Sequence, residues 1–239
     1  SLVLCMRRFF VSDLPNTHEP LCLLDEKESH HLFRVVKIAK GEEIALFDGK
    51  GSGCVAVLVE TKEQRAQVRW VRDVRTEKVQ KEVWLFLSVL KQQAWSTALR
   101  MATELGVHHI VPVLSARTIA RKEKKDRWES IILAAVKQCG RTTIPTLHPM
   151  QSLDQICLEQ TSIPNRLILV PNTHSLSDYS GCGDVALLIG PEGGFSSQEI
   201  QKATQNGWVA CGLGHTVLRA DTATVSALSL FLLSTPISK

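Results

Sequence analysis

Three glycines around a short turn are the residues of this sequence best suited to bind a ligand. Gly190, Gly193 and Gly194 lie in "LLIGPEGGFSSQEI", residues 187–200, where an apolar run gives way to polar residues. Glycine lets a ligand lie against the backbone and adopts angles closed to other residues. Amides exposed after a strand of an α/β sheet often bind nucleotide-like ligands. The turn therefore predicts such a site, with an ordinary strand-to-helix turn as the alternative.

Two further segments are expected to follow strands at the same edge of a sheet. They are "LVPNTHS", residues 169–175, and "GLGHTVLRAD", residues 212–221. Because the carboxyl ends of parallel strands meet at one edge, a single ligand can touch all three segments. The last segment carries Arg219 just before Asp221, the expected cap of a helix. An ion pair between this arginine and a nearby carboxylate is the alternative to a role in the site.

The elements that would position these segments alternate between strand and helix from Val83 onward. This order predicts a largely parallel sheet flanked by helices. Strands are expected in "EVWLFLSVL" (82–90), "VHHIVPVL" (107–114), "RLILV" (166–170), "DVALLIG" (184–190) and "WVACGLG" (208–214). One helix is expected to end at Gly106, and a second is expected to have Asp126 as its N-terminal cap. A third should begin at Ser196 or Ser197, with Glu199 completing a capping box, and a final helix should have Asp221 as its cap.

The first part of the chain has a different pattern, which favours strands. "EIALFDGKGSGCVAVLVE" (43–60) contains two β-rich runs joined by a glycine-containing turn, and "AQVRWVRDV" (66–74) alternates apolar and polar residues. We predict a small β-barrel or sandwich over residues 1–75. The charged stretch 75–82 is the expected linker, so the second domain is placed at 76–239.

Composition and missing motifs exclude several classes of protein. The seven cysteines of the 239-residue chain form no C-x-x-C pair, which argues against a disulfide framework or a zinc site. The sequence has no P-loop, no G-x-G-x-x-G after a strand and no G-x-S-x-G elbow. His108 and His109 are expected in a strand, where adjacent side chains diverge and make a metal site improbable. No apolar run reaches membrane-spanning length and no secretory signal is apparent, so a cytoplasmic protein is expected.

Basic residues point to a nucleic acid more by their position than by the net charge of +4. They gather in the first part of the chain and again early in the second. Isolated arginines suit phosphate and base contacts, whereas the lysines of "RKEKKDR" (121–127) also fit a simple solvated loop. The clustered residues are Arg7, Arg8, Arg34, Lys37, Lys91, Arg117, Arg121, Lys122, Lys124, Lys125, Arg127 and Arg141.

The ordered set of motifs resembles one family, the RsmE-type 16S rRNA uridine-N3 methyltransferases of the SPOUT class. The resemblance covers nearly the whole chain. It implies an α/β fold in which a PUA-like β-barrel that binds RNA precedes a SPOUT methyltransferase domain with a C-terminal trefoil knot. The matching segments are "RRFFV" (7–11), "HHLFRVVKIAKGEEIALFDGKG" (30–51), "ATELGVHHIVPVLSARTIAR" (102–121), "RWESIILAAVKQCGRTTIP" (127–145), "LLIGPEGGFSSQEI" (187–200) and "LGHTVLRADTA" (213–223).

The resemblance also implies a cofactor and partners. The three segments would bind S-adenosylmethionine. The protein would form a homodimer whose binding site for the RNA of the small ribosomal subunit lies between the two protomers. No metal is implied. The implied cofactor-binding residues are Val170, Pro171, Gly190, Pro191, Glu192, Gly193, Gly194, Leu213, Gly214 and Leu218.

Roles in methyl transfer follow from the chemistry of uridine N3, which must lose a proton. Arg219 is expected to stabilise the developing negative charge, and Glu192 is a weaker candidate for orienting the base or accepting the proton. The expected RNA contacts are Arg8, Arg34, Lys37, Lys91, Arg117, Gln138 and Arg141.

Two alternatives remain open from the sequence. One is a SPOUT methyltransferase acting on another RNA nucleotide, because the cofactor segments do not encode the acceptor. The other is a non-catalytic RNA-binding protein of the same fold. Met101 and Lys37 depart from the family's usual residues, and neither lies in a glycine segment.

Overall fold

The computed structural model describes residues 6–74, 79–119, 122, 124–159 and 162–233. It divides into two compact units. The first comprises Ser1–Lys78 and Val136–Ile144, and the second comprises Val79–Ala135 and Pro145–Lys239. The predicted boundary between residues 75 and 76 and the basic residue Arg121 lie outside the described residues.

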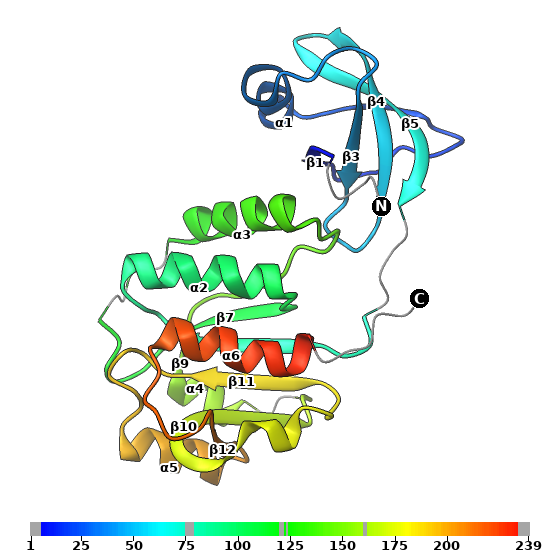
Figure 1. Cartoon of the computed structure of the whole chain (residues 1–239). Helices are drawn as coiled ribbons and strands as arrows, with labels where there is room; N and C mark the ends of the chain where they lie inside the picture. The colour runs from blue at the N-terminus through cyan, green and yellow to red at the C-terminus, as the bar shows by residue number, and fades with distance from the viewer. Residues whose placement is uncertain (1–5, 75–78, 120–121, 123, 160–161, 234–239) are drawn as a thin grey trace. The chain divides into compact units, whose positions relative to one another are not determined.

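The first unit is built on a five-stranded sheet with the order β1-β3-β4-β5-β2 (Figure 1). β1 pairs with β3 in parallel, and the other pairs are antiparallel. Phe9, Leu24, Leu32 and Ile44 are completely buried in its core. The elements are β1 (Arg8–Phe10), β2 (Leu21–Leu23), α1 (Glu26–His30), the π-helical turn η2 (His31–Val36), β3 (Glu43–Phe47), β4 (Gly53–Lys62) and β5 (Arg65–Val74).

A segment distant in sequence, Val136–Ile144, completes this unit. The backbone N–H of Ile144 donates to the Gly49 carbonyl over 2.8 Å, next to the β3–β4 turn. The carboxylate of Glu28, only 3% exposed, pairs with the Lys137 ammonium. Because a buried carboxylate needs a compensating cation, this pair links the segment to α1. The sequence pattern places the segment only in and after a helix of the second domain and does not reveal this packing.

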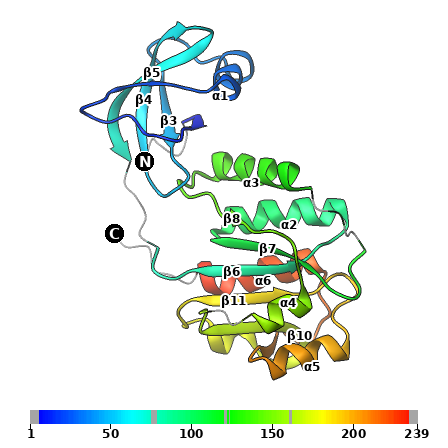
Figure 2. The same cartoon turned by 180° about the vertical axis from the view of Figure 1, so that it is seen from behind.

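The second unit has a parallel sheet with the order β12-β10-β11-β6-β7-β8, and β9 pairs with β7 (Figure 2). Every residue of β11 is buried, as expected for a central strand covered on both faces. The strands are β6 (Val83–Ser88), β7 (His109–Leu114), β8 (Thr146–Leu147), β9 (Gln151–Ser152), β10 (Asn165–Ser175), β11 (Val185–Ile189) and β12 (Val209–Gly212).

Helices cover both faces of this sheet. α6 lies on one face with α2 beside it, and α4 lies on the opposite face with α5 beside it (Figures 1 and 2). The predicted alternation of strand and helix is confirmed. The helices are α2 (Gln92–Leu105), α3 (Lys125–Cys139), α4 (Leu153–Leu158), the 3₁₀ turn η3 (Leu176–Tyr179), α5 (Ser197–Gln205) and α6 (Ala220–Leu232).

The helix ends confirm two predicted caps and correct two others. Gly106 ends α2 with a φ of 107°, and Ser196 caps α5 in a capping box with Glu199. Asp126 and Asp221 are not caps, since each lies in the first turn of a helix that begins one residue earlier. A carboxylate in the first turn is still stabilised by the unpaired amides and the helix dipole.

Two strand predictions also need correction. β10 continues to Ser175, so "LVPNTHS" belongs to an irregular strand and does not simply follow one. Asn172 has a φ of 59°, and the register against β12 shifts between Leu169 and His174. His109 begins β7, whereas His108 lies just before the strand. The Nδ1 atom of His108 accepts a hydrogen bond from the backbone N–H of Val83 over 3.0 Å, which fixes it ahead of the strand.

The described cysteines, which exclude Cys5, are all free. Burial raises the pKa of the Cys54 thiol to about 12 and also raises the pKa of Cys157 and Cys211. Thiols protonated at neutral pH are poor nucleophiles and poor metal ligands, which fits structural roles. In the described residues no group of His, Cys, Asp and Glu side chains suits a metal ion, and no helix has the length and apolarity needed to cross a membrane.

His109 and His148 form a stacked cluster with Trp84 at the amino end of β7. The Trp84 and His109 ring centroids are 3.7 Å apart, and His109 Nδ1 lies 3.0 Å from His148 Nε2. Burial lowers the pKa of both histidines, although Glu82, 3.4 Å from His109 Nε2, opposes this at His109. The cluster therefore favours neutral imidazoles.

This cluster should make stability depend on pH. Below about pH 6.5 the histidines of the unfolded chain become protonated, whereas those of the folded cluster stay neutral to lower pH. The free energy of unfolding should therefore fall as the pH is lowered. Urea denaturation at about pH 7.5 and 5.5 measures the change. His148→Gln should reduce the difference in unfolding free energy between the two pH values. His18→Gln, which replaces an exposed histidine of the first unit, should leave that difference unchanged. Equal pH dependence in the wild type and His148→Gln would contradict the assignment.

Candidate functional site

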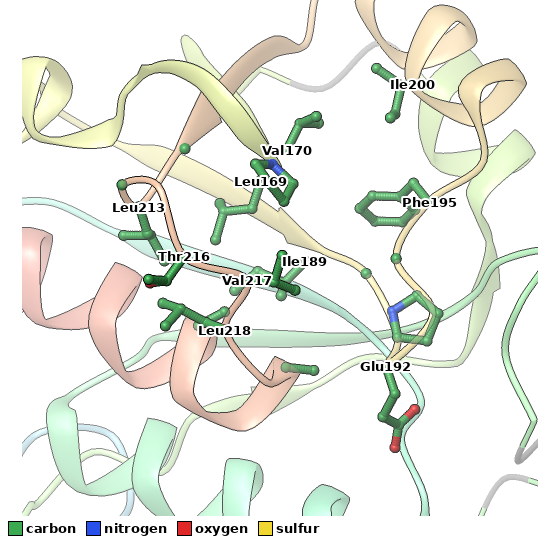
Figure 3. A pocket seen from close by; sticks show the side chains of 18 residues that line it. Leu169, Val170, Ile189, Glu192, Phe195, Ile200, Leu213, Thr216, Val217 and Leu218 are labelled. Carbon is green, nitrogen blue, oxygen red and sulfur yellow. The ribbon is translucent and has the colours of Figure 1, made fainter.

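A pocket opens at the carboxyl edge of β10, β11 and β12 (Figure 3). Its walls come from the end of β10, the turn after β11 and the segment that joins β12 to α6. Most of its side chains are apolar. The lining residues are Leu169, Val170, Pro171, Ile189, Gly190, Pro191, Glu192, Gly194, Phe195, Ile200, Gly212, Leu213, Gly214, Thr216, Val217, Leu218, Ala220 and Ala223.

Glycines give this pocket its open backbone. A Cβ atom built on Gly194 or Gly214 meets no atom within 4 Å, and both residues have positive φ angles, 67° and 106°. Gly190 and Gly212 serve packing instead, because a Cβ there would lie 3.2 Å from the Phe195 ring and 3.1 Å from the Val170 carbonyl oxygen. Two glycines thus expose the main chain to a ligand, and two allow the walls to approach each other.

Nine of the ten residues predicted to bind the cofactor line the pocket, and Gly193 does not. Its carbonyl oxygen accepts a hydrogen bond from Arg117 Nη1 over 2.6 Å. Cofactor binding by the other nine stays a prediction. Nine further lining residues were not predicted to bind the cofactor, although all of them lie within the quoted segments: Leu169, Ile189, Phe195, Ile200, Gly212, Thr216, Val217, Ala220 and Ala223.

Among the described residues that line the pocket, Glu192 is the only charged one. Its carboxylate points away from the other labelled side chains in Figure 3. Oε1 accepts a hydrogen bond from the backbone N–H of Lys91 over 3.1 Å, at the N-cap of α2. Apart from this carboxylate, the pocket presents mainly apolar side chains and backbone.

Arg219 lies at the rim of the pocket and does not line it. It is the N-cap of α6, and its neighbours Leu218 and Ala220 are both lining residues. The arginine is exposed and makes no capping bond through its side chain. The carboxylate of Asp221 accepts instead from the backbone N–H of Thr222 over 2.9 Å. Within the described residues, no ion pair joins Arg219 to Asp221.

The predicted RNA contacts are divided between the two units. Arg8, Arg34, Lys37, Gln138 and Arg141 belong to the first unit, and Lys91 and Arg117 belong to the second. Arg34 and Lys37 are exposed around the end of η2, where Lys37 adopts the left-handed conformation with a φ of 60°. Arg8 Nη1 donates to the Lys137 carbonyl over 3.3 Å. Five of the seven predicted contacts therefore belong to the first unit and two to the second.

Comparison with known proteins identifies the family. The model of an RNA methyltransferase domain matches residues 76–232, and the model of an RNA methyltransferase PUA domain matches residues 24–69. The chain is also 30% identical over 230 residues to ribosomal RNA small subunit methyltransferase E of Aquifex aeolicus, which covers 89% of this chain and 94% of that protein. The chain belongs to this methyltransferase E family.

Two solved structures support the fold of the family. One is a ribosomal RNA small subunit methyltransferase E from Neisseria gonorrhoeae bound to S-adenosyl methionine, with a TM-score of 0.87, 31% identity and coverage of 94% of this chain and 95% of that one. The other is a putative methyltransferase from Legionella pneumophila in complex with the same cofactor, with a TM-score of 0.85, 30% identity and coverage of 96% and 98%.

These similarities confirm the predicted fold class of a PUA domain followed by an α/β methyltransferase domain of the SPOUT class. The trefoil knot stays a prediction, because strand order defines which strands are neighbours and not how the chain threads between them. The pocket lies within the part of the chain that matches the methyltransferase domain.

Proposed function

We propose that this protein uses S-adenosylmethionine to methylate N3 of a uridine in the 16S rRNA of the small ribosomal subunit. The observation that carries the proposal is the pocket at the carboxyl edge of β10, β11 and β12. Members of the methyltransferase E family match this chain over nearly its whole length, and the similar Neisseria structure is bound to the cofactor. Such a substrate places the enzyme in the cytoplasm.

The residues of the pocket fit this cofactor. A nucleoside with a flat base is held well by apolar walls such as Leu169, Ile189 and Phe195, with exposed peptide groups to fix its orientation. Gly194 and Gly214 leave open space where other residues would carry a side chain. We assign Val170, Pro171, Gly190, Pro191, Glu192, Gly194, Leu213, Gly214 and Leu218 to direct binding, and Gly193 to the loop's support.

When bound, the cofactor supplies a methyl group on a positively charged sulfonium. The protein's own task is to orient the uridine and to stabilise the negative charge left when N3 loses its proton. Arg219, exposed at the pocket rim, is the proposed cation. Glu192 Oε1 already accepts a hydrogen bond from the backbone N–H of Lys91, so Oε2 is the atom proposed to accept the proton from N3. Because N3 lies on the Watson–Crick edge, the uridine must be unpaired or turned outward.

The exposed cations of the first unit provide a test of RNA binding. We expect the double variant Arg34→Ala, Lys37→Ala to weaken RNA binding and to reduce its salt dependence, by about one unit of slope for each phosphate that the variant no longer neutralises. Cofactor affinity should not change. Filter binding at several salt concentrations measures the effect, with Arg69→Ala as a control at an exposed arginine of β5 outside the predicted contacts. Equal slopes in the wild type and the double variant would argue against this RNA surface.

We further propose a homodimer with the RNA site between its subunits. In that arrangement Arg8, Lys91, Gln138 and Arg141 would join Arg34 and Lys37 in binding RNA. Light scattering of the purified protein measures the oligomeric state, and a monomer at micromolar concentration would refute this part of the proposal.

The proposed reaction is tested by incubating the protein with small-subunit RNA or 30S particles that lack the modification, together with labelled S-adenosylmethionine. Mapping of the product should locate the label on N3 of a single uridine. A label on another nucleotide would support a different acceptor. Absence of cofactor affinity in titration calorimetry would support a non-catalytic RNA-binding protein.

A further inference from the structure

The turn after β11 is held from outside the pocket by two neighbouring loops. Lys91, after β6, donates its backbone N–H to Glu192 Oε1 over 3.1 Å. Ala116, after β7, donates its backbone N–H to Glu199 Oε1 over 2.7 Å. Glu199 Oε2 in turn accepts from the Ser196 N–H over 2.8 Å. The glycine turn and the first turn of α5 are thus connected to the loops that follow β6 and β7.

The middle of the turn is held by a side chain, that of Arg117. Its Nη1 atom donates to the Gly193 carbonyl oxygen over 2.6 Å. The stem of Arg117 also lies along Gly193, since a Cβ built on this glycine would be 3.2 Å from Arg117 Cδ. A charged donor forms a stronger hydrogen bond to a carbonyl than a neutral donor does. Gly193 therefore faces Arg117, while Gly194 lines the pocket.

Buried hydroxyl groups fix the loop that carries Arg117. Ser115 Oγ lies 3.1 Å from Ser88 Oγ and 2.9 Å from Thr118 Oγ1, and Thr118 Oγ1 also accepts from the Ser115 N–H. All three residues are at most 5% exposed. A satisfied buried hydrogen-bond network is rigid, so Arg117 projects from a fixed base.

We propose that Arg117 is a positioning residue for the cofactor-binding turn and acts through the Gly193 carbonyl. The inference rests on the proposed function, because it takes S-adenosylmethionine as the ligand of the pocket. Arg117 lowers the cost of binding by holding the peptide groups around Gly193 and Gly194 in their binding conformation. This role differs from the direct RNA contact expected from the sequence.

Substitution of Arg117 tests this role in the full-length protein. Arg117→Ala should raise the Kd for S-adenosylmethionine roughly 10-fold, the scale of losing a hydrogen bond to a charged group, and Arg117→Lys should recover part of the loss. In methylation assays the KM for the cofactor should rise while the KM for RNA and kcat change little. Arg100→Ala removes an exposed arginine that pairs with Glu104 on α2 and serves as the control.

A double-mutant cycle with Gly193 separates this contact from a general loss of stability. Gly193→Ala should raise the cofactor Kd in the wild type, because its Cβ displaces the Arg117 stem, and should have much less effect in the Arg117→Ala background. Additive effects of the two substitutions would overturn the inference, and so would an unchanged cofactor Kd in Arg117→Ala with weaker RNA binding. If the wild type binds no S-adenosylmethionine, the proposed function fails as well.

Discussion

Arg219→Ala should lower kcat for methyl transfer roughly 10²–10³-fold, the scale seen when one preorganised charge-stabilising group is removed. The Kd for S-adenosylmethionine should change little, since Arg219 lies at the rim and does not line the pocket. The uridine anion exists only during the reaction, so a fixed cation acts mainly on the transition state. Arg219→Lys should recover only part of the rate, because the charge returns without the planar guanidinium.

The competing role for Arg219 is a structural clamp at the start of α6. The structure argues against it, since the side chain makes no capping bond and the Asp221 carboxylate accepts from Thr222. A clamp predicts that Arg219→Ala lowers the melting temperature and cofactor affinity together. Thermal unfolding, titration calorimetry and single-turnover methylation on one preparation distinguish the two roles. Near-normal turnover would exclude the catalytic role.

Gly194→Val should abolish measurable binding of S-adenosylmethionine, a loss on the order of 100-fold or more. The φ of Gly194 is 67°, a conformation that a β-branched residue rarely adopts, so the turn would have to change its path. No protein atom lies within 4 Å of the added Cβ. The side chain would therefore extend into space that the cofactor is proposed to occupy, and strain and obstruction would act together.

Two matched substitutions separate these effects. Gly194→Ala introduces the backbone strain, about 1–2 kcal/mol, with little obstruction, and should give an intermediate Kd. Gly183→Val places the same side chain at an exposed glycine that has open space and no positive φ, and should bind normally. Circular dichroism and melting temperatures confirm folding. Normal cofactor affinity in folded Gly194→Val would place the cofactor elsewhere.

The sequence by itself determined the fold class, because local periodicity carries that information. Alternating strands and helices from Val83 predicted the parallel sheet, and the strand-rich first part predicted the small β unit. The glycine turn was also visible, since few residues other than glycine adopt the conformation found at Gly194. Ser196 and Glu199 were recognisable as a capping box because the interaction spans only three residues.

The tertiary structure decided the contacts between residues that are distant in sequence. Val136–Ile144 joins the first unit through contacts such as the pair of Glu28 and Lys137, and no local pattern links these two residues. Gly193 bonds to Arg117, which lies on another loop, whereas Gly194 lines the pocket. The local sequence predicts the backbone conformation of each segment. The residue that a given side chain contacts depends instead on how the segments pack together. The sequence therefore predicted where the pocket would form, and only the packing showed which residues support it from outside.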